Sequence, residues 1–224
     1  MIILALTLGL LPGFAWLVFY MAEDRHAEPK RLIVLTFVAG MAFAFFAVVV
    51  EQLFNNAAAI ANIPEFSIIS LVGLALIEEV AKFVAADFAV GKSPALADPV
   101  DVMIYMIVAA LGFATLENIG AIANGGAAGA TLLATVFQMV SLRFVGATLL
   151  HSLTSGIVGY HWAKGIARKQ VGRNLLLGLA IATALHAFFN YLILNYGNIA
   201  YSVVFLVLVG FVVLNDFEKL KESK

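Results

Sequence analysis

The fold is decided by residues 68–86, IISLVGLALIEEVAKFVAA, which have the length and apolar character of a membrane-spanning helix. Three ionisable residues, Glu78, Glu79 and Lys82, lie in the second half of this stretch. Each of them costs about 2.5–3.5 kcal/mol at the centre of a bilayer on insertion scales. Such groups normally face a bundle interior or a water-filled cavity, so we expect this helix to contribute to a functional site.

The whole chain is too apolar for a soluble domain. Of its 224 residues, 63% are hydrophobic and 12% are charged, whereas about a quarter of a soluble domain is charged. We therefore expect an all-α, polytopic transmembrane helix bundle, a single integral membrane domain over residues 1–224 that crosses the cell membrane several times and contacts the lipid bilayer. The net charge of −1, without a basic stripe, gives no indication of nucleic-acid binding. The absence of cysteine excludes disulfides, thiolate metal sites and cysteine catalysis.

Apolar runs predict seven spans, of which the first lacks a charged segment before it and is expected to be retained. The fourth has a helix-start signature, with Asp98 as the N-cap, Pro99 in the first position and Asp101 in the first turn. Most of the 13 basic residues lie in the loops after spans one, three and five and at the C-terminus. This distribution predicts that the N-terminus is outside and the C-terminus is cytoplasmic. The seven spans are predicted at residues 2–21, 32–53, 66–90, 101–122, 131–160, 174–195 and 199–216.

Polar groups recur inside spans three to six. After the acidic pair of span three come Glu117-Asn118 on span four, Arg143 and His151 on span five, and His186 and Asn190 on span six. On a helix, residues three or four apart share a face, so Lys82 can pair with either glutamate, and His186 and Asn190 point at one neighbour. His151 follows Arg143 by eight residues, about two turns, on roughly the same side. The small-residue pairs Ser152/Gly156 and Ser155/Gly159 are expected to let another helix approach closely.

Each of these groups also has a structural explanation when it is taken alone. Glu78 and Lys82 could be an inert ion pair, His151 a buried hydrogen-bonded histidine, and His186 with Asn190 an interhelical contact. Arg143 could pair with a carboxylate, Glu117-Asn118 could face water, and Glu51-Gln52 is expected at the membrane interface. Packing does not readily explain why four consecutive spans each carry such a group.

Glutamate, histidine and asparagine without cysteine suit hydrolysis. One mechanism uses a glutamate as general base on water, with histidine or asparagine N–H groups stabilising the oxyanion. Another binds a metal, with Zn²⁺ the ion considered and Glu79, His151 and His186 as candidate ligands, leaving a fourth position for water. The usual zinc helix His-Glu-x-x-His is absent. Both mechanisms remain open at this point.

The order of the motifs resembles the PrsW family of membrane proteases. The resemblance covers roughly residues 66–195, a protease-like motif core, and rests on Glu78-Glu79-x-x-Lys82, Gly112-Phe113-Ala114-x-x-Glu117-Asn118, His151, and His186-x-x-x-Asn190. It implies peptide-bond cleavage in or beside the membrane, of the site-1 type that acts on membrane-anchored anti-sigma factors. By matched motif, Glu78, Glu79, His151 and His186 correspond to the family's functional residues. In the wider superfamily of CAAX prenyl endopeptidases the second motif ends in histidine, and the Glu117-Asn118 found here argues against a prenyl-CAAX substrate.

These observations lead to the hypothesis of an endopeptidase acting on membrane-anchored protein substrates. Glu78 or Glu79 would activate water, and His186 with Asn190 would clamp the oxyanion. His151 and Glu117 would orient water, serve as acid or complete a metal site, while Lys82, Asn118 and Arg143 would support them. The principal alternative is a proton- or cation-coupled transporter that uses the same buried groups. A bis-histidine haem protein and a non-catalytic protein with this fold are further alternatives, and the oligomeric state stays open.

Overall fold

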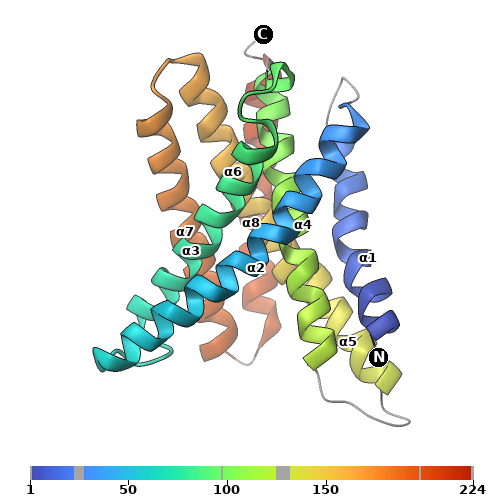
Figure 1. Ribbon diagram of the computed structural model, residues 1–224, viewed down its shortest axis with the longest axis vertical. Coiled ribbons are helices and arrows are strands. Elements are labelled where there is room, and N and C mark those ends of the chain that lie inside the picture. Colours follow the sequence, from blue (N-terminus) through green and yellow to red (C-terminus); the bar gives the residue numbers. More distant parts are fainter. Residues whose placement is uncertain (1, 23–27, 97, 125–131, 197, 223–224) are drawn as a thin grey trace.

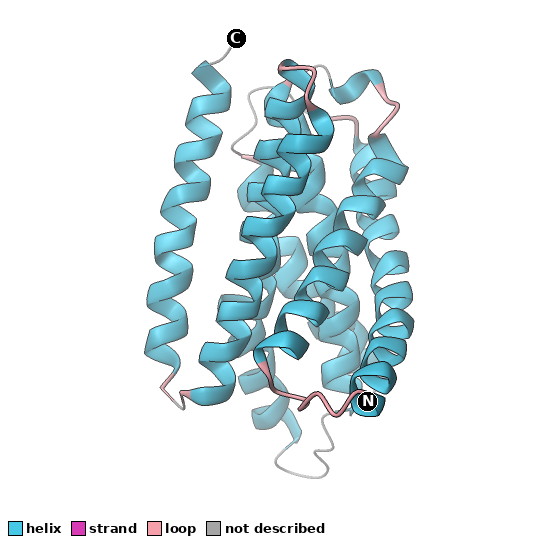
Figure 2. Ribbon diagram, turned by 90° about the vertical axis from the view of Figure 1, so that its left-hand side faces the viewer, coloured by secondary structure: helices cyan, strands magenta, loops and turns pink. Residues whose placement is uncertain are grey.

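The computed structural model describes residues 2–22, 28–96, 98–124, 132–196 and 198–222, and every regular element in these ranges is helical (Figures 1 and 2). The helices run side by side along the long axis of the molecule, and the two ends of the chain lie at opposite ends of the bundle. The predicted all-α bundle is therefore confirmed. The helices are α1 (Ile2–Met21), α2 (Lys30–Ile60), α3 (Ile68–Val90), α4 (Pro99–Asn124), α5 (Leu132–Val145), α6 (Ala147–Ala167), α7 (Val171–Asn195) and α8 (Ile199–Glu222), with a 3₁₀ turn, η1 (Pro94–Leu96), before α4.

The outer surface of the bundle is apolar, as a lipid-facing surface requires. Four of the described helices, α2, α4, α7 and α8, are both long and apolar enough to cross a membrane. Large apolar side chains such as Phe46, Phe88, Leu176 and Phe211 point outward and are exposed. Which end of the bundle faces the cytoplasm stays a prediction. Arg25 is one of the basic residues on which that prediction rests, and it lies outside the described residues. So do residues 125–129 of the flexible turn that the glycine-rich sequence 124–129 predicts.

The fifth predicted span, residues 131–160, is not one helix. Residues 132–145 and 147–167 form α5 and α6, which are separated by Gly146 with φ −100° and ψ −96°. A Cβ at Gly146 would lie 2.6 Å from the carbonyl oxygen of Leu142, so the break requires a residue without a side chain. Arg143 and His151 consequently lie on different helices, and the expectation that they share one helical face is wrong.

Helix α4 forms the centre of the bundle, where its side chains are buried from Val100 to Thr115. It begins as predicted, with the Asp98 side chain accepting a hydrogen bond from the amide of Val100 at 3.1 Å. Neighbouring helices reach it through glycines. A Cβ on Gly159 of α6 would lie 2.7 Å from the Cα of Met103, which confirms the close approach expected from the small residues of α6. This contact joins the second half of α6 to the first turns of α4.

Helix α2 is longer than predicted and crosses α4 at a tilt (Figure 1). Its 31 residues span about 46 Å at 1.5 Å per residue, well beyond the hydrocarbon thickness of a bilayer. The crossing is made by two facing glycines, because a Cβ on Gly40 would lie 2.0 Å from the carbonyl oxygen of Ala109 and a Cβ on Gly112 would lie 1.9 Å from that of Phe37. The extension places Glu51 inside the helix and not at its end.

Candidate active site

Four helices bring the ionisable residues together within the bundle. Glu78, Glu79 and Lys82 come from α3, Glu117 from α4, His151 from α6 and His186 from α7. Glu117, His151 and His186 lie in the halves of their helices nearer the end of the bundle at which α6 begins and α4 and α7 end, and the three α3 residues lie near the middle of that helix. The interatomic distances below show that side chains from all four helices meet there.

Glu79 is the most firmly held carboxylate of this group. Its side chain is fully buried, and its Oε1 atom accepts hydrogen bonds from Lys82 Nζ at 2.6 Å and Thr154 Oγ1 at 3.0 Å. The same oxygen lies 2.8 Å from Nδ1 of His186. Lys82 therefore pairs with Glu79, and one oxygen atom connects α3, α6 and α7.

Glu78 is held much less firmly and faces both histidines. Its Oε2 atom lies 3.8 Å from Nδ1 of His151 and 3.6 Å from Nε2 of His186. This oxygen is buried and has no hydrogen-bond partner among the described residues. Because buried polar atoms are nearly always paired, an unpaired carboxylate oxygen between two imidazoles indicates a place for a ligand.

Each imidazole is oriented by a second carboxylate. His186 uses Nδ1 to contact Glu79, and His151 uses Nε2 to contact Glu117 Oε2 at 2.9 Å. A carboxylate accepts hydrogen bonds, so we assign the ring hydrogens to these two nitrogens. The remaining nitrogen of each ring is then unprotonated and faces Glu78. Lys82 Nζ, 3.0 Å from Nδ1 of His151, agrees with this assignment because an ammonium group only donates.

Arg143 and Asn118 support Glu117 from the outer side of the site. Arg143 Nη2 lies 3.2 Å from Glu117 Oε2, and its Nε donates to Oδ1 of Asn118. The Asn118 amide donates in turn to Thr148 Oγ1 at 3.0 Å. Arg143 and His151 thus both reach Glu117, although they lie on separate helices.

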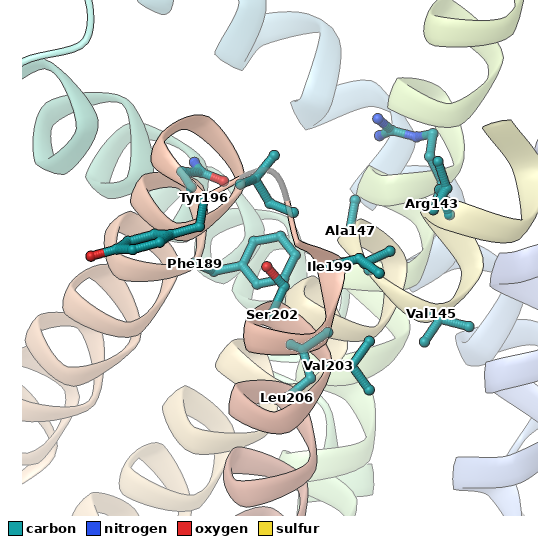
Figure 3. A pocket seen from close by; sticks show the side chains of 13 residues that line it. Arg143, Val145, Ala147, Phe189, Tyr196, Ile199, Ser202, Val203 and Leu206 are labelled. Carbon is teal, nitrogen blue, oxygen red and sulfur yellow. The ribbon is translucent and has the colours of Figure 1, made fainter.

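Asn190 lies one turn beyond His186 and lines an adjoining cavity of about 570 Å³. Figure 3 shows this cavity, which is lined mainly by apolar side chains such as Phe189, Ile199 and Leu206 and has Arg143 at one side. None of the hydrogen bonds described above, which connect the site residues, involves Asn190. His186 contacts Glu79 while Asn190 lines this cavity, and the expectation that the two act on one substrate atom stays a prediction.

Glu78, His151 and His186 can hold a metal ion. One ligand atom from each lies within 4.8 Å of the other two. Ligands at the usual zinc distances in a tetrahedral site are separated by about 3.3–3.6 Å, so small side-chain adjustments would suffice. The two carboxylate–imidazole contacts supply the outer support that metal-bound histidines normally have.

The local charge also favours a cation. With both histidines neutral, the carboxylates of Glu78, Glu79 and Glu117 exceed the cations Lys82 and Arg143 by one negative charge. A divalent ion would compensate this excess within a low-dielectric site. The sequence-based candidate for the carboxylate ligand was Glu79, but the structure turns Glu78 toward both histidines.

The bis-histidine haem alternative does not fit these histidines. The two rings have centroids 5.1 Å apart and are nearly perpendicular, at 84°, which leaves no room for a porphyrin between them.

Thr154 was missed in the sequence, although it is fully buried and donates to Glu79. Thr154 follows His151 by three residues and therefore shares its helical face, a spacing from which its place in the site could have been predicted.

Comparison with known proteins identifies relatives of this chain. A family model described as PrsW family intramembrane metalloprotease matches residues 28–214, which include every site residue named above. Protease PrsW of Geobacillus kaustophilus (strain HTA426) is 27% identical over 188 residues, covering 83% of this chain and 78% of that protein. Protease PrsW of Oceanobacillus iheyensis is 24% identical over 220 residues, covering 97% and 96%. No solved structure matches the chain.

Proposed function

Since the chain belongs to the PrsW family of intramembrane metalloproteases, we propose that it hydrolyses a peptide bond in membrane-anchored protein substrates. The observation that supports this proposal best is the buried Oε2 of Glu78, which has no hydrogen-bond partner among the described residues and faces the unprotonated nitrogens of His151 and His186. Lys82 Nζ donates to the His151 nitrogen in the structure, so metal binding there would require Lys82 to release it and donate to Glu79 alone. An inert ion-pair network would have no reason to leave such an atom unpaired.

We propose Glu78, His151 and His186 as the ligands of a catalytic metal. Zinc bound by this set would supply Lewis-acid chemistry, polarising a carbonyl group and activating water. The supporting carboxylates keep each ring in the tautomer that presents a lone pair, Glu79 for His186 and Glu117 for His151.

Glu79 is the general base in this proposal. Its Oε1 atom is fixed by Lys82, Thr154 and His186, whereas its Oε2 atom is buried without a partner and can accept a proton. Glu79 takes the proton from the attacking water as the oxygen–carbon bond forms. It then gives the proton to the leaving nitrogen as the carbon–nitrogen bond breaks. Asn190 can donate a hydrogen bond to the substrate backbone from the adjoining cavity.

The depth of the site suggests where a substrate is cut. Glu78 lies ten residues after the start of α3, and His186 nine residues before the end of α7, which corresponds to about 15 Å from the helix ends. Since the hydrocarbon core of a bilayer is about 30 Å thick, the cleaved bond would then lie well inside a substrate's membrane span. A single-span regulator of the anti-sigma-factor type, cut in a site-1-type step, is the substrate class that we propose.

The proposal is tested with purified protein in lipid vesicles and a fluorescently labelled single-span substrate. We expect cleavage that Glu78→Gln and His186→Ala each abolish without loss of folded protein. Glu79→Gln should abolish cleavage too, and it should also lower stability because the buried Lys82 loses its carboxylate. The control is Glu65→Gln, which removes an acidic residue in the α2–α3 connection outside the site. Full activity in Glu78→Gln or His186→Ala would contradict the assignment.

Metal dependence is tested on the same preparation by elemental analysis and chelation. We expect about one zinc per chain in the unmodified protein, loss of cleavage with a chelator, and recovery on adding zinc. Full cleavage by metal-free protein would instead favour the mechanism in which a glutamate alone activates water. Solute uptake driven by a pH gradient, without cleavage, would favour the transporter alternative.

A further inference from the structure

A second cavity, of about 720 Å³, lies on the other side of Arg143, between α2, α4 and α5. Most of its lining is apolar, including Phe45 and Val48 of α2, but Glu51 and Glu117 contribute carboxylates. Glu117 also contacts His151, so this cavity reaches the groups that support the site.

Glu51 differs from the other glutamates that line the site. Glu79 and Glu117 are held by cations and histidines, whereas Glu51 makes no hydrogen bond or ion pair with any residue in the described part of the chain. It is partly buried, with nine further residues of α2 beyond it, and its charge interacts with those of Glu117 and Lys82. A partly desolvated carboxylate next to another carboxylate is costly unless a cation joins it.

The two cavities have different chemistry and share Arg143 in their linings. The cavity in Figure 3 is mainly apolar, and the second combines apolar walls with a carboxylate that has no partner. A polypeptide that extends from one to the other passes the Arg143–Glu117 pair, which adjoins His151.

We propose that Glu51 is a specificity-determining residue that binds a lysine or arginine side chain of the substrate beside the cleaved bond. Apolar walls around a carboxylate suit such a side chain, because its methylene stem can pack against Phe45 and Val48 while its charged end reaches Glu51. The cavity in Figure 3 then receives apolar residues from the other side of the cleaved bond. This inference rests on the proposed protease function and specifies its substrate class: a membrane span that carries a basic residue next to the cleaved bond.

The test compares substrates with lysine, glutamine or glutamate placed in turn at each residue flanking the cut. At one position we expect kcat/KM with lysine to exceed that with glutamine by about tenfold, equivalent to one partly desolvated ion pair. Glu51→Gln should remove this preference while cleavage of the glutamine substrate continues, and Glu51→Lys should favour the glutamate substrate. Glu65→Gln, the matched control, should keep the preference for lysine.

The failure of this inference is distinguishable from the failure of the proposed function. A lysine preference that survives Glu51→Gln, or equal cleavage of all three substrates, overturns the role of Glu51 and leaves the protease intact. If the unmodified protein cleaves no substrate, the proposed function is overturned and the inference falls with it.

A second test measures substrate binding in a chain that retains Glu51. The chain contains no cysteine, so Val48→Cys introduces a single thiol into the cavity lining. In a Glu78→Gln background, we expect disulfide trapping of a substrate that carries cysteine next to lysine. The yield should fall about tenfold when that lysine is replaced by glutamine. Equal trapping of the lysine, glutamine and glutamate substrates overturns the inference.

Discussion

The replacement Glu117→Gln tests whether a supporting carboxylate controls metal binding from outside the ligand set. Glutamine keeps the shape of Glu117 but removes the charge that attracts His151 Nε2 at 2.9 Å and Arg143 Nη2 at 3.2 Å. A hydrogen bond to a charged group contributes about 1.5–3 kcal/mol and a neutral one about 0.5–1.5 kcal/mol. The imidazole contact alone should therefore weaken by about 1–1.5 kcal/mol, and the partly exposed Arg143 pair adds little after solvent screening.

This difference corresponds to a loss of metal affinity of about five- to twelvefold, near the lower end of the 10–100-fold that such replacements typically cause. The assay is a zinc titration of metal-free protein against a chromophoric chelator, with thermal unfolding as an independent measure, because zinc that binds only the folded state raises Tm. Glu78→Gln removes a proposed ligand and should lose more zinc affinity than Glu117→Gln. Glu65→Gln should lose none and serves as the control.

Unchanged zinc affinity in Glu117→Gln, together with a clear loss in Glu78→Gln, would refute the view that Glu117 orients His151. Unchanged affinity in both variants would refute the metal site itself. A loss in Glu117→Gln as large as that in Glu78→Gln would indicate that Glu117 binds the metal directly.

Three further predictions concern the packing that positions the site. Lys82→Met should destabilise the protein by about 3–5 kcal/mol, because it leaves the buried Glu79 without its cation, and Glu79→Gln in the same chain should recover part of that loss in a chemical-unfolding assay. Gly146→Ala should lower the free energy of unfolding by about 1–3 kcal/mol and reduce cleavage, because a Cβ would lie 2.6 Å from the Leu142 carbonyl oxygen. The control Gly172→Ala adds a Cβ that has no atom within 4 Å and should leave cleavage intact. Gly40→Ala and Gly112→Ala should each lower Tm by forcing α2 and α4 apart, whereas Gly210→Ala, also in open space, should not.

The extent of α1, α3, α4 and α7 could be predicted to within three residues because it depends on apolar runs that the bilayer enforces. The start of α4 at Pro99 also followed from local chemistry, since an aspartate cap before proline satisfies a helix terminus. The break at Gly146 could not be predicted, because a single glycine inside an apolar helix is usually tolerated. Its backbone angles, φ −100° and ψ −96°, lie outside the helical range.

The sequence predicted which helices form the site but not which atoms face each other within it. Polar residues on spans three to six indicated correctly which helices meet. Adjacent residues on a helix point about 100° apart, so Glu78 and Glu79 must face different neighbours. Which of them faces the free nitrogens of His151 and His186 depends on the rotation of α3 within the bundle, and the sequence contains no measure of that rotation. Glu51 was expected at the membrane interface for a similar reason. Its position in the same cavity lining as Glu117 depends on where α2 crosses α4, which the sequence does not specify.

Structural and catalytic explanations of the polar residues are compatible in this bundle. Lipid gives no hydrophobic driving force between helices, so a buried network such as Lys82–Glu79–His186 helps to hold α3 and α7 together. The same contacts immobilise the imidazole and orient its free nitrogen. In such a network the atoms available for chemistry are those that the packing leaves unpaired, Oε2 of Glu78 and Oε2 of Glu79. Both belong to neighbouring residues of one helix turn, so a small rotation of α3 would move the proposed ligand and the proposed base together. Three side chains hold Oε1 of Glu79 in place. We infer that these contacts set the rotation of α3 and therefore the geometry of the whole site.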